Sequence, residues 1–154
     1  MTRTAARPEP IVADGDDDDW FCLELPPLAV AATVARSAIR RVFTFDDPDR
    51  ESSFLVALTE IVTNAIDEHR VHAPDRAVVV EVGLGRFPEV RVIDEGRGLD
   101  LTDTDDVAGE GPAPTDQTGR GLALARAFVP SLSFVTSPNG TTAILPLDGF
   151  GSPR

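Results

Sequence analysis

An apolar segment in the first half of the chain places a carboxylate and an amide one helical turn apart. Its hydrophobic residues recur every three or four positions, which predicts a helix with one buried face. These residues are Leu55, Leu58, Ile61, Val62, Ala65 and Ile66. Glu60 and Asn64 lie four positions apart, so their side chains stack on the same helix. Glu can accept a proton and an Asn oxygen can bind Mg²⁺, but such a pair is also typical of a helix edge facing solvent.

The charge of the chain restricts what it binds. Its 154 residues fit one domain with a real core, and the formal net charge of −12 disfavours nucleic acid as a direct partner. All 14 basic residues are arginine, so a Walker-type phosphate loop, which needs lysine, is excluded. Any phosphate would have to be bound by arginine, by backbone N–H groups or by a metal ion.

Cysteine content and hydropathy predict a cytoplasmic protein. A single cysteine, Cys22, excludes an internal disulfide, and its place in an apolar run predicts a buried thiol. No apolar run approaches the roughly 20 residues that cross a bilayer. Residues 1–10 contain arginine and proline but no apolar stretch of the kind found in secretory signals, so we expect no contact with a membrane.

The domain pattern predicts a leader, a folded domain and a short tail. Residues 1–19 end in an aspartate run and read as a disordered acidic leader. Residues 20–148 carry the periodic segments, and residues 149–154 read as a flexible C-terminal tail.

Periodicity within the folded domain predicts an α+β protein. The expected elements are, in order, a strand at 20–25, helices at 28–43 and 50–68, strands at 77–82 and 89–94, a long lid at 95–118, a helix from 119, and strands at 131–136 and 141–147. Residues 69–74, with His69 and His72, are expected to form a loop. This order predicts a two-layer sandwich in which a mixed or antiparallel sheet has helices on one face.

Two glycine-containing segments could contact a ligand. Asp94 ends a strand, where its carboxylate could accept from an exocyclic amine, and Gly96 and Gly98 would let the backbone approach a flat ring. The same pattern also occurs in ordinary turns. Gly119 to Leu122 lies where the lid becomes a helix, and a helix N-terminus attracts anions even though many bind none.

Taken in order, these motifs resemble those of the GHKL (Bergerat-fold) ATPase and kinase superfamily. Glu60-x-x-x-Asn64-Ala65 resembles its N box, Asp94-x-Gly96-x-Gly98 its G1 box and Gly119-x-Gly121-Leu122 its G2 box. Gly140-Thr141-Thr142 resembles the Gly-Thr element of the same superfamily. The short first strand, the Ala/Arg-rich first helix and the size of the chain resemble the anti-sigma factor serine/threonine kinase branch.

The resemblance implies an ATP site with assigned roles. Glu60 would be the catalytic base, Asn64 the Mg²⁺ ligand and Asp94 the acceptor for the adenine amine. Further ATP-binding residues implied by the resemblance are Gly96, Gly98, Gly119, Arg120, Gly121, Leu122 and Thr141. The implied cofactors are ATP and Mg²⁺, and the implied partners are a sigma factor, an anti-sigma factor antagonist and a second copy of the chain in a homodimer.

One departure from the family pattern keeps a second function open. Relatives commonly carry a histidine four residues after the N-box asparagine, whereas this chain carries Glu68 there, preceded by Asp67. Negative charge near the phosphates favours a nucleotide-gated interaction module that binds ATP without transferring phosphate. A small structural domain without a ligand is the third alternative.

Overall fold

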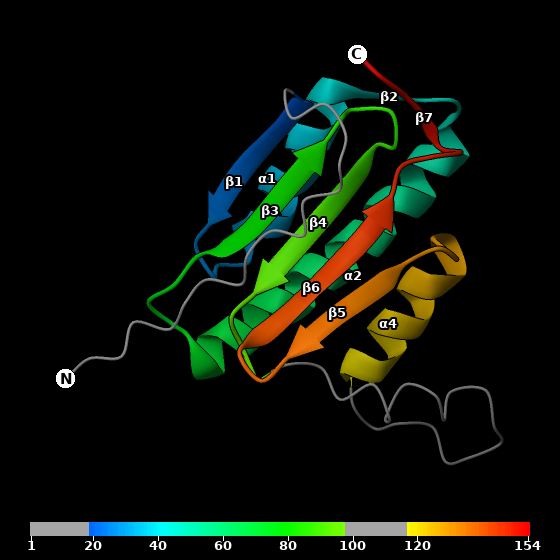
Figure 1. Ribbon diagram of the computed structural model, residues 1–154. Coiled ribbons are helices and arrows are strands. Elements are labelled where there is room, and N and C mark those ends of the chain that lie inside the picture. The colour runs from blue at the N-terminus through cyan, green and yellow to red at the C-terminus, as the bar shows by residue number, and fades with distance from the viewer. Residues whose placement is uncertain (1–18, 98–116) are drawn as a thin grey trace, which may run out of the picture.

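The computed structural model describes residues 19–97 and 117–154, which form one sheet covered on a single face by helices (Figure 1). The predicted α+β two-layer sandwich is confirmed, and every strand pairing in the main sheet is antiparallel. The expected acidic leader, except for Asp19, and most of the expected lid lie outside the described residues.

The main sheet has five strands in the order β1-β3-β4-β6-β5. They are β1 (Trp20–Leu25), β3 (Val78–Gly83), β4 (Glu89–Asp94), β6 (Gly140–Pro146) and β5 (Ser133–Ser137). Short turns join β3 to β4 and β5 to β6. The central strand β4 pairs with β6, whose residues are distant in sequence (Asp94 pairs with Thr141), so this pairing depends on the whole fold.

Alternating side chains give the sheet one apolar face. Val80 pairs with Val92, which in turn pairs with Ala143, and all three are buried on the side that faces the helices. Residues of the neighbouring positions are only partly buried on the opposite side. This period of two is the pattern that made the strands predictable.

Three helices form the second layer. They are α1 (Val30–Val42), α2 (Pro48–His72) and α4 (Gln117–Phe128), and α2 lies between the other two and packs on β3 and β4. The Asp47 carboxylate caps α2 by accepting from Arg50 N–H at 2.8 Å, and Pro48 stands in the first turn. A proline there costs no hydrogen bond, so the local sequence fixes where this helix begins.

The end of α2 differs from the prediction. The helix continues to His72, whereas residues 69–74 were expected to form a loop. His69 is fully buried, and both of its ring nitrogens are hydrogen-bonded to backbone groups outside the helix. Contacts distant in sequence therefore extend the helix past the point where its apolar pattern fades.

A second, small sheet was not predicted. Strand β2 (Phe43–Phe45) pairs with β7 (Gly151–Pro153), so the segment expected as a tail contains a strand. The ring of Phe54 lies 5.2 Å from the ring of Phe150, centroid to centroid, and links this sheet to α2. Three-residue strands carry too short an alternation to be recognised from sequence.

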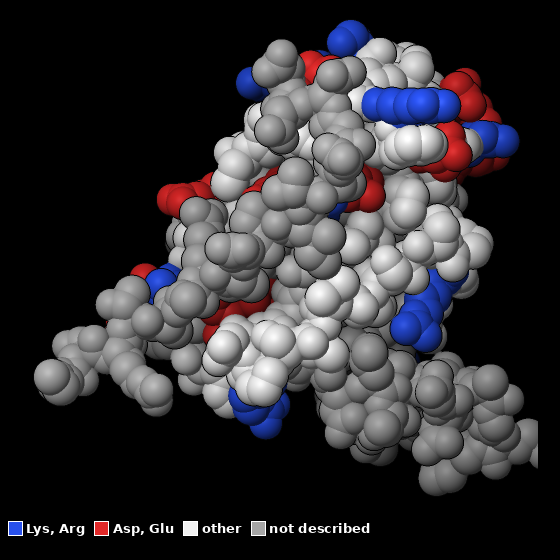
Figure 2. All heavy atoms as spheres, viewed as in Figure 1, with Lys and Arg blue, Asp and Glu red and all other residues white. Residues whose placement is uncertain are grey.

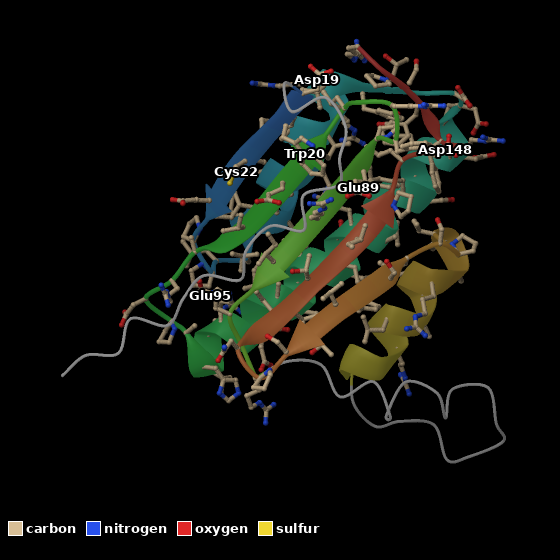
Figure 3. The ribbon with its side chains drawn as sticks, viewed as in Figure 1. Asp19, Trp20, Cys22, Glu89, Glu95 and Asp148 are labelled. Carbon is tan, nitrogen blue, oxygen red and sulfur yellow. The ribbon has the colours of Figure 1, made fainter. Side chains whose placement is uncertain are left out.

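The face of the main sheet opposite the helices bears mixed side chains. Figure 3 shows Trp20, Cys22 and Glu89 on this face, and Cys22 is exposed, contrary to the expected buried thiol. The Arg91 guanidinium lies 4.3 Å from the centre of the Trp20 ring and binds Glu89 at 2.6 Å.

Charged side chains of both signs cluster at one corner of the face shown in Figure 2, and others are scattered over the rest of that face. Blue and red side chains gather near β7 in Figure 2, where Arg50 forms ion pairs with Asp46 and Asp47. Among the described helices none is long and apolar enough to span a membrane.

Candidate functional site

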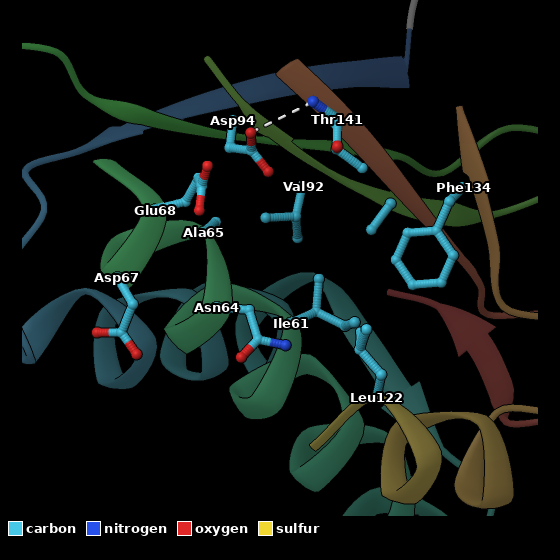
Figure 4. A pocket seen from close by; sticks show the side chains of 11 residues that line it. Ile61, Asn64, Ala65, Asp67, Glu68, Val92, Asp94, Leu122, Phe134 and Thr141 are labelled. Carbon is cyan, nitrogen blue, oxygen red and sulfur yellow. Dashed lines mark hydrogen bonds between the residues drawn. The ribbon is translucent and has the colours of Figure 1, made fainter. Parts of the chain in front are cut away.

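A cavity of about 170 Å³ lies between α2, α4 and the end of the sheet formed by β4, β5 and β6 (Figure 4). Its lining residues are Ile61, Asn64, Ala65, Asp67, Glu68, Val92, Asp94, Leu122, Phe134, Thr141 and Ala143. Apolar side chains form the floor, and carboxylates and an amide stand along one wall. This combination of an apolar bed with a few polar groups is typical of small-molecule sites.

Asp94 and Thr141 are brought together by the register of β4 and β6. They are direct partners across the two strands, and the Thr141 N–H donates to Asp94 Oδ1 at 3.3 Å, the bond drawn in Figure 4. The Gly96 N–H donates to the same oxygen at 3.0 Å. Because no hydrogen bond from the described residues reaches Oδ2, that oxygen remains to accept from a ligand in the cavity.

A glycine makes this close approach of the strands possible. Gly140 has φ of +148°, and a Cβ there would come within 2.0 Å of the Asp94 carbonyl oxygen. No other residue fits that backbone and that space. The Gly140-Thr141 pair therefore has a geometric reason to stand opposite Asp94.

Burial is the main influence on the Asp94 carboxyl. It raises the pKa of Asp94 above its ordinary value, and the negative charge of Glu68 acts in the same direction. The N–H groups of Gly96 and Thr141 lower it, but only in part. A carboxylate held in an apolar pocket with a raised pKa is typical of a ligand-binding position.

The Glu68 side chain packs against the backbone of the turn at Gly96. A Cβ on Gly96 would come within 2.0 Å of Glu68 Cγ, so the turn needs glycine here. Glu68 Oε1 accepts from Arg97 N–H at 3.0 Å and from Arg97 Nε at 3.3 Å. Burial acts to raise the pKa of Glu68, but these bonds, the charge of Arg97 and that of His72 lower it below its ordinary value. Glu68 is thus held as a carboxylate at the cavity wall.

Glu60 lies beside the first turns of α4 rather than in the cavity. The helix begins at Gln117, two residues before the predicted start, so Gly119 lies in its first turn and Gly121 in its second. A Cβ on Gly121 would come within 2.5 Å of Glu60 Oε2. Gly121 therefore gives the Glu60 carboxylate room to lie against the helix whose N-terminus is the predicted anion site.

The predicted residues separate into three groups in space. Asn64, Asp94, Leu122 and Thr141 line the cavity, whereas Glu60 lies against Gly121 outside it and Gly96 is buried against Glu68. Arg120 is exposed on α4. Gly98 lies outside the described residues.

Sequence reasoning missed part of the lining. Val92, Phe134 and Ala143 lie on the inner face of three strands, where alternation marks them as core without showing that they border a cavity. Their negative charge marks Asp67 and Glu68 in the sequence, and both residues line the cavity. Glu68 lies four residues after Asn64, which places the two side chains on the same helix face, and this spacing is the sequence signal that could have identified Glu68.

Asn64 shows that the cavity suits a polar ligand. Its Nδ2 atom is buried and has no hydrogen-bond partner among the described residues. A buried amide without a partner is costly unless a ligand or solvent satisfies it. The amide and carboxylate oxygens at this wall are of the kind that bind Mg²⁺, whereas the Nδ2 group itself needs a hydrogen-bond acceptor.

Comparison with known families identifies the domain. Residues 24–146 match the sequence model of the histidine kinase-like ATPase domain. The chain belongs to the histidine kinase-like ATPase family. Membership in this family, part of the GHKL superfamily, agrees with the order of the N, G1 and G2 motifs. No curated protein matches the chain.

Two solved structures resemble this histidine kinase-like ATPase domain. The first contains the RsbU and RsbW domains of Rv1364c from Mycobacterium tuberculosis, with 22% identity, a TM-score of 0.56 and 87% of this chain aligned. The chain spans 32% of that protein. The second is the histidine kinase domain of the blue-light activated kinase EL346 from Erythrobacter litoralis, with 19% identity, a TM-score of 0.48, and coverage of 81% of this chain and 66% of that one. The first likeness supports the fold.

Proposed function

We propose that this ATPase-family domain is a Mg²⁺-dependent serine/threonine protein kinase of the anti-sigma factor type. In this function it phosphorylates an anti-sigma factor antagonist and regulates transcription in the cytoplasm by sequestering a sigma factor. The observation that carries the proposal is the cavity that both Asn64 and Asp94 line, together with the Glu60 carboxylate, which lies against Gly121 on α4.

The cavity would take the adenine end of ATP. Asp94 Oδ2 would accept from the exocyclic amine, and Val92, Leu122 and Phe134 would enclose the ring. Thr141 would hold Asp94 in place through its N–H and add a hydroxyl at the rim. The phosphates would then extend toward the start of α4, where the positive end of the helix dipole and Arg120 would supply positive charge in a chain without lysine.

Glu60 and Asn64 would serve the transfer step. Glu60 would take the proton of the substrate hydroxyl. The hydroxyl oxygen would bond to the γ-phosphorus as the bond between that phosphorus and the ADP oxygen breaks. Asn64 would hold Mg²⁺ through its amide oxygen. When bound, the ion would supply charge neutralisation for the phosphates. Because phosphoryl transfer depends mainly on positioning and charge, a small domain can perform it.

A phosphotransfer assay tests this function. The purified chain is incubated with labelled Mg-ATP and a cognate antagonist protein, in parallel with Glu60→Ala. Loss of a general base predicts a fall in transfer of about 10²- to 10⁴-fold. Glu51→Ala, which removes a carboxylate near the start of the same helix, is the matched control and should transfer normally. Absence of transfer by the unchanged protein, equal to Glu60→Ala, would refute the kinase activity.

A second function is favoured by Glu68. Its carboxylate lines the cavity and is held there by Arg97, at a wall where negative charge opposes phosphate binding. A nucleotide-gated interaction module would bind ATP and a protein partner without phosphorylating it. Saturable ATP binding without transfer, together with partner binding that depends on ATP, would select this function over the kinase.

A further inference from the structure

His69 is a buried polar residue whose place in the fold the motif pattern does not explain. It lies in the last turn of α2 and is fully buried, one position after Glu68. A buried imidazole is costly unless both ring nitrogens find partners. An apolar residue would fill the same space without that requirement, so the partners indicate what the histidine does.

Both partners are backbone groups. Nδ1 lies 3.0 Å from the carbonyl oxygen of Arg76, and the Glu95 N–H points to Nε2 at 2.9 Å. A carbonyl can only accept, so Nδ1 carries the hydrogen. An N–H can only donate, so Nε2 carries none. The neighbours thus fix His69 as the neutral Nδ1–H tautomer.

The hydrogen bond from Glu95 N–H to His69 Nε2 holds the turn that carries Asp94 in place. Glu95 follows Asp94 directly, and its N–H belongs to the peptide plane between them. Gly96 N–H and Thr141 N–H both donate to Asp94 Oδ1, which orients the side chain. The Glu95 side chain is held as well, since its Oε2 lies 2.7 Å from Arg76 Nε. The Glu95 N–H is therefore tied to α2 through His69, and the Glu95 carboxylate is paired with Arg76.

We propose that His69 is a positioning residue of the nucleotide site. By accepting from Glu95 N–H it holds the turn from Asp94 to Gly96, so that Asp94 Oδ2 faces the cavity and can accept from an exocyclic amine. The inference rests on the proposed ATP site and adds a residue that does not itself touch the ligand.

Two substitutions separate positioning from stability. His69→Leu removes both hydrogen bonds, whereas His69→Gln keeps one donor and one acceptor on a planar amide. Ile66→Ala is the control for lost packing, because Ile66 is buried on the same helix and does not line the cavity. Circular dichroism confirms that each variant is folded at the temperature of the assays.

Three readouts then apply to these proteins. In the unchanged protein, ¹⁵N NMR should show His69 protonated on Nδ1 and not on Nε2. Amide exchange at Glu95 should accelerate in His69→Leu and remain slow in Ile66→Ala. Affinity for Mg-ATP should fall roughly fivefold or more in His69→Leu, the effect of about one lost hydrogen bond. It should recover at least in part in His69→Gln and stay unchanged in Ile66→Ala.

The failures are distinguishable. A proton on Nε2, or a folded His69→Leu that binds ATP like the unchanged protein, would overturn the positioning role. An equal loss of affinity in Ile66→Ala would also overturn it, because helix stability would then explain the effect. If the unchanged protein binds no adenine nucleotide, the proposed function fails and the positioning role fails with it, even where exchange at Glu95 shows the turn to be fastened.

Discussion

The Glu60 carboxylate lies against Gly121, at a separation that leaves no room for a Cβ on the glycine. Glu60 belongs to α2 and Gly121 to α4, so the contact joins the two helices that border the candidate site. The far end of a glutamate is flexible and can swing away from an added methyl group. Substitution of the glycine therefore tests the position of the carboxylate separately from the fold.

Gly121→Ala is expected to reduce phosphoryl transfer without destabilising the protein. Alanine in a helix interior is more favourable than glycine by about 1 kcal/mol, so Tm should be unchanged or higher. Displacement of Glu60 should lower the transfer rate by about tenfold or more, since proton transfer depends on geometry. Gly85→Ala is the matched control, because nothing lies within 4 Å of a Cβ there. Full activity in Gly121→Ala would contradict the placement of the base.

Asp94→Asn is expected to leave the fold as stable as the unchanged protein, or more so, near neutral pH. Burial raises the pKa of Asp94, so the folded protein binds this proton more tightly than the unfolded chain. The stability that this tighter proton binding gives the folded state is fully present below the ordinary pKa of aspartate. It is lost as pH rises through the raised pKa of Asp94. Asparagine cannot ionise, yet its oxygen can still accept from Gly96 and Thr141.

Thermal unfolding between pH 4 and pH 7 measures this effect, with about one pH unit between samples. The Tm of Asp94→Asn should exceed that of the unchanged protein by the largest margin at pH 7, and this margin should shrink on acidification. A variant that is much less stable at pH 7 would mean that the ionised carboxylate contributes to the fold.

Glu68→Gln is expected to strengthen ATP binding, most clearly when Mg²⁺ is absent. The substitution removes a negative charge from the cavity wall but keeps an acceptor for Arg97 N–H. Affinity should rise several-fold without Mg²⁺, an order of magnitude typical of one nearby charge, and less with it. Asp148→Asn makes the same change of charge at the far end of the sheet from Glu95 (Figure 3) and should have no effect. Equal affinities for all three proteins would show that Glu68 does not face the phosphates.

Gly151→Ala is expected to destabilise the protein without changing nucleotide affinity. A Cβ on Gly151 would come within 2.0 Å of the Thr44 carbonyl oxygen, and backbone cannot yield as a side chain can. The pairing of β2 with β7 should weaken, at a cost of about 1–3 kcal/mol. Chemical denaturation measures the loss and calorimetry the affinity. Weakened ATP binding by the folded variant would show coupling between this small sheet and the cavity.

The sequence predicted the elements whose pattern is local. Strands β1 and β4 have the predicted bounds because their alternation continues to both ends. The pairing of Glu60 with Asn64 on one helix likewise follows from spacing alone. The end of α2 was predicted wrongly because His69 is held by Arg76 and Glu95, and no local pattern shows those contacts.

The candidate site was only partly predictable for the same reason. Asp94 meets Thr141 through the register of β4 and β6, which are distant in sequence and become neighbours only in the folded sheet. The contact of Glu68 with Gly96 depends in turn on where α2 lies against β4. Resemblance to a family supplied the link among the motifs that spacing could not.

Calorimetric titration of Mg-ATP into the unchanged protein and into Asp94→Asn tests the central claim most directly. The account predicts saturable binding at one site per chain in the unchanged protein. It predicts a loss of at least about tenfold in the variant, since hydrogen bonds to charged groups contribute about 1.5–3 kcal/mol. Absence of binding by the unchanged protein, or equal binding by both, would contradict an ATP site at Asp94.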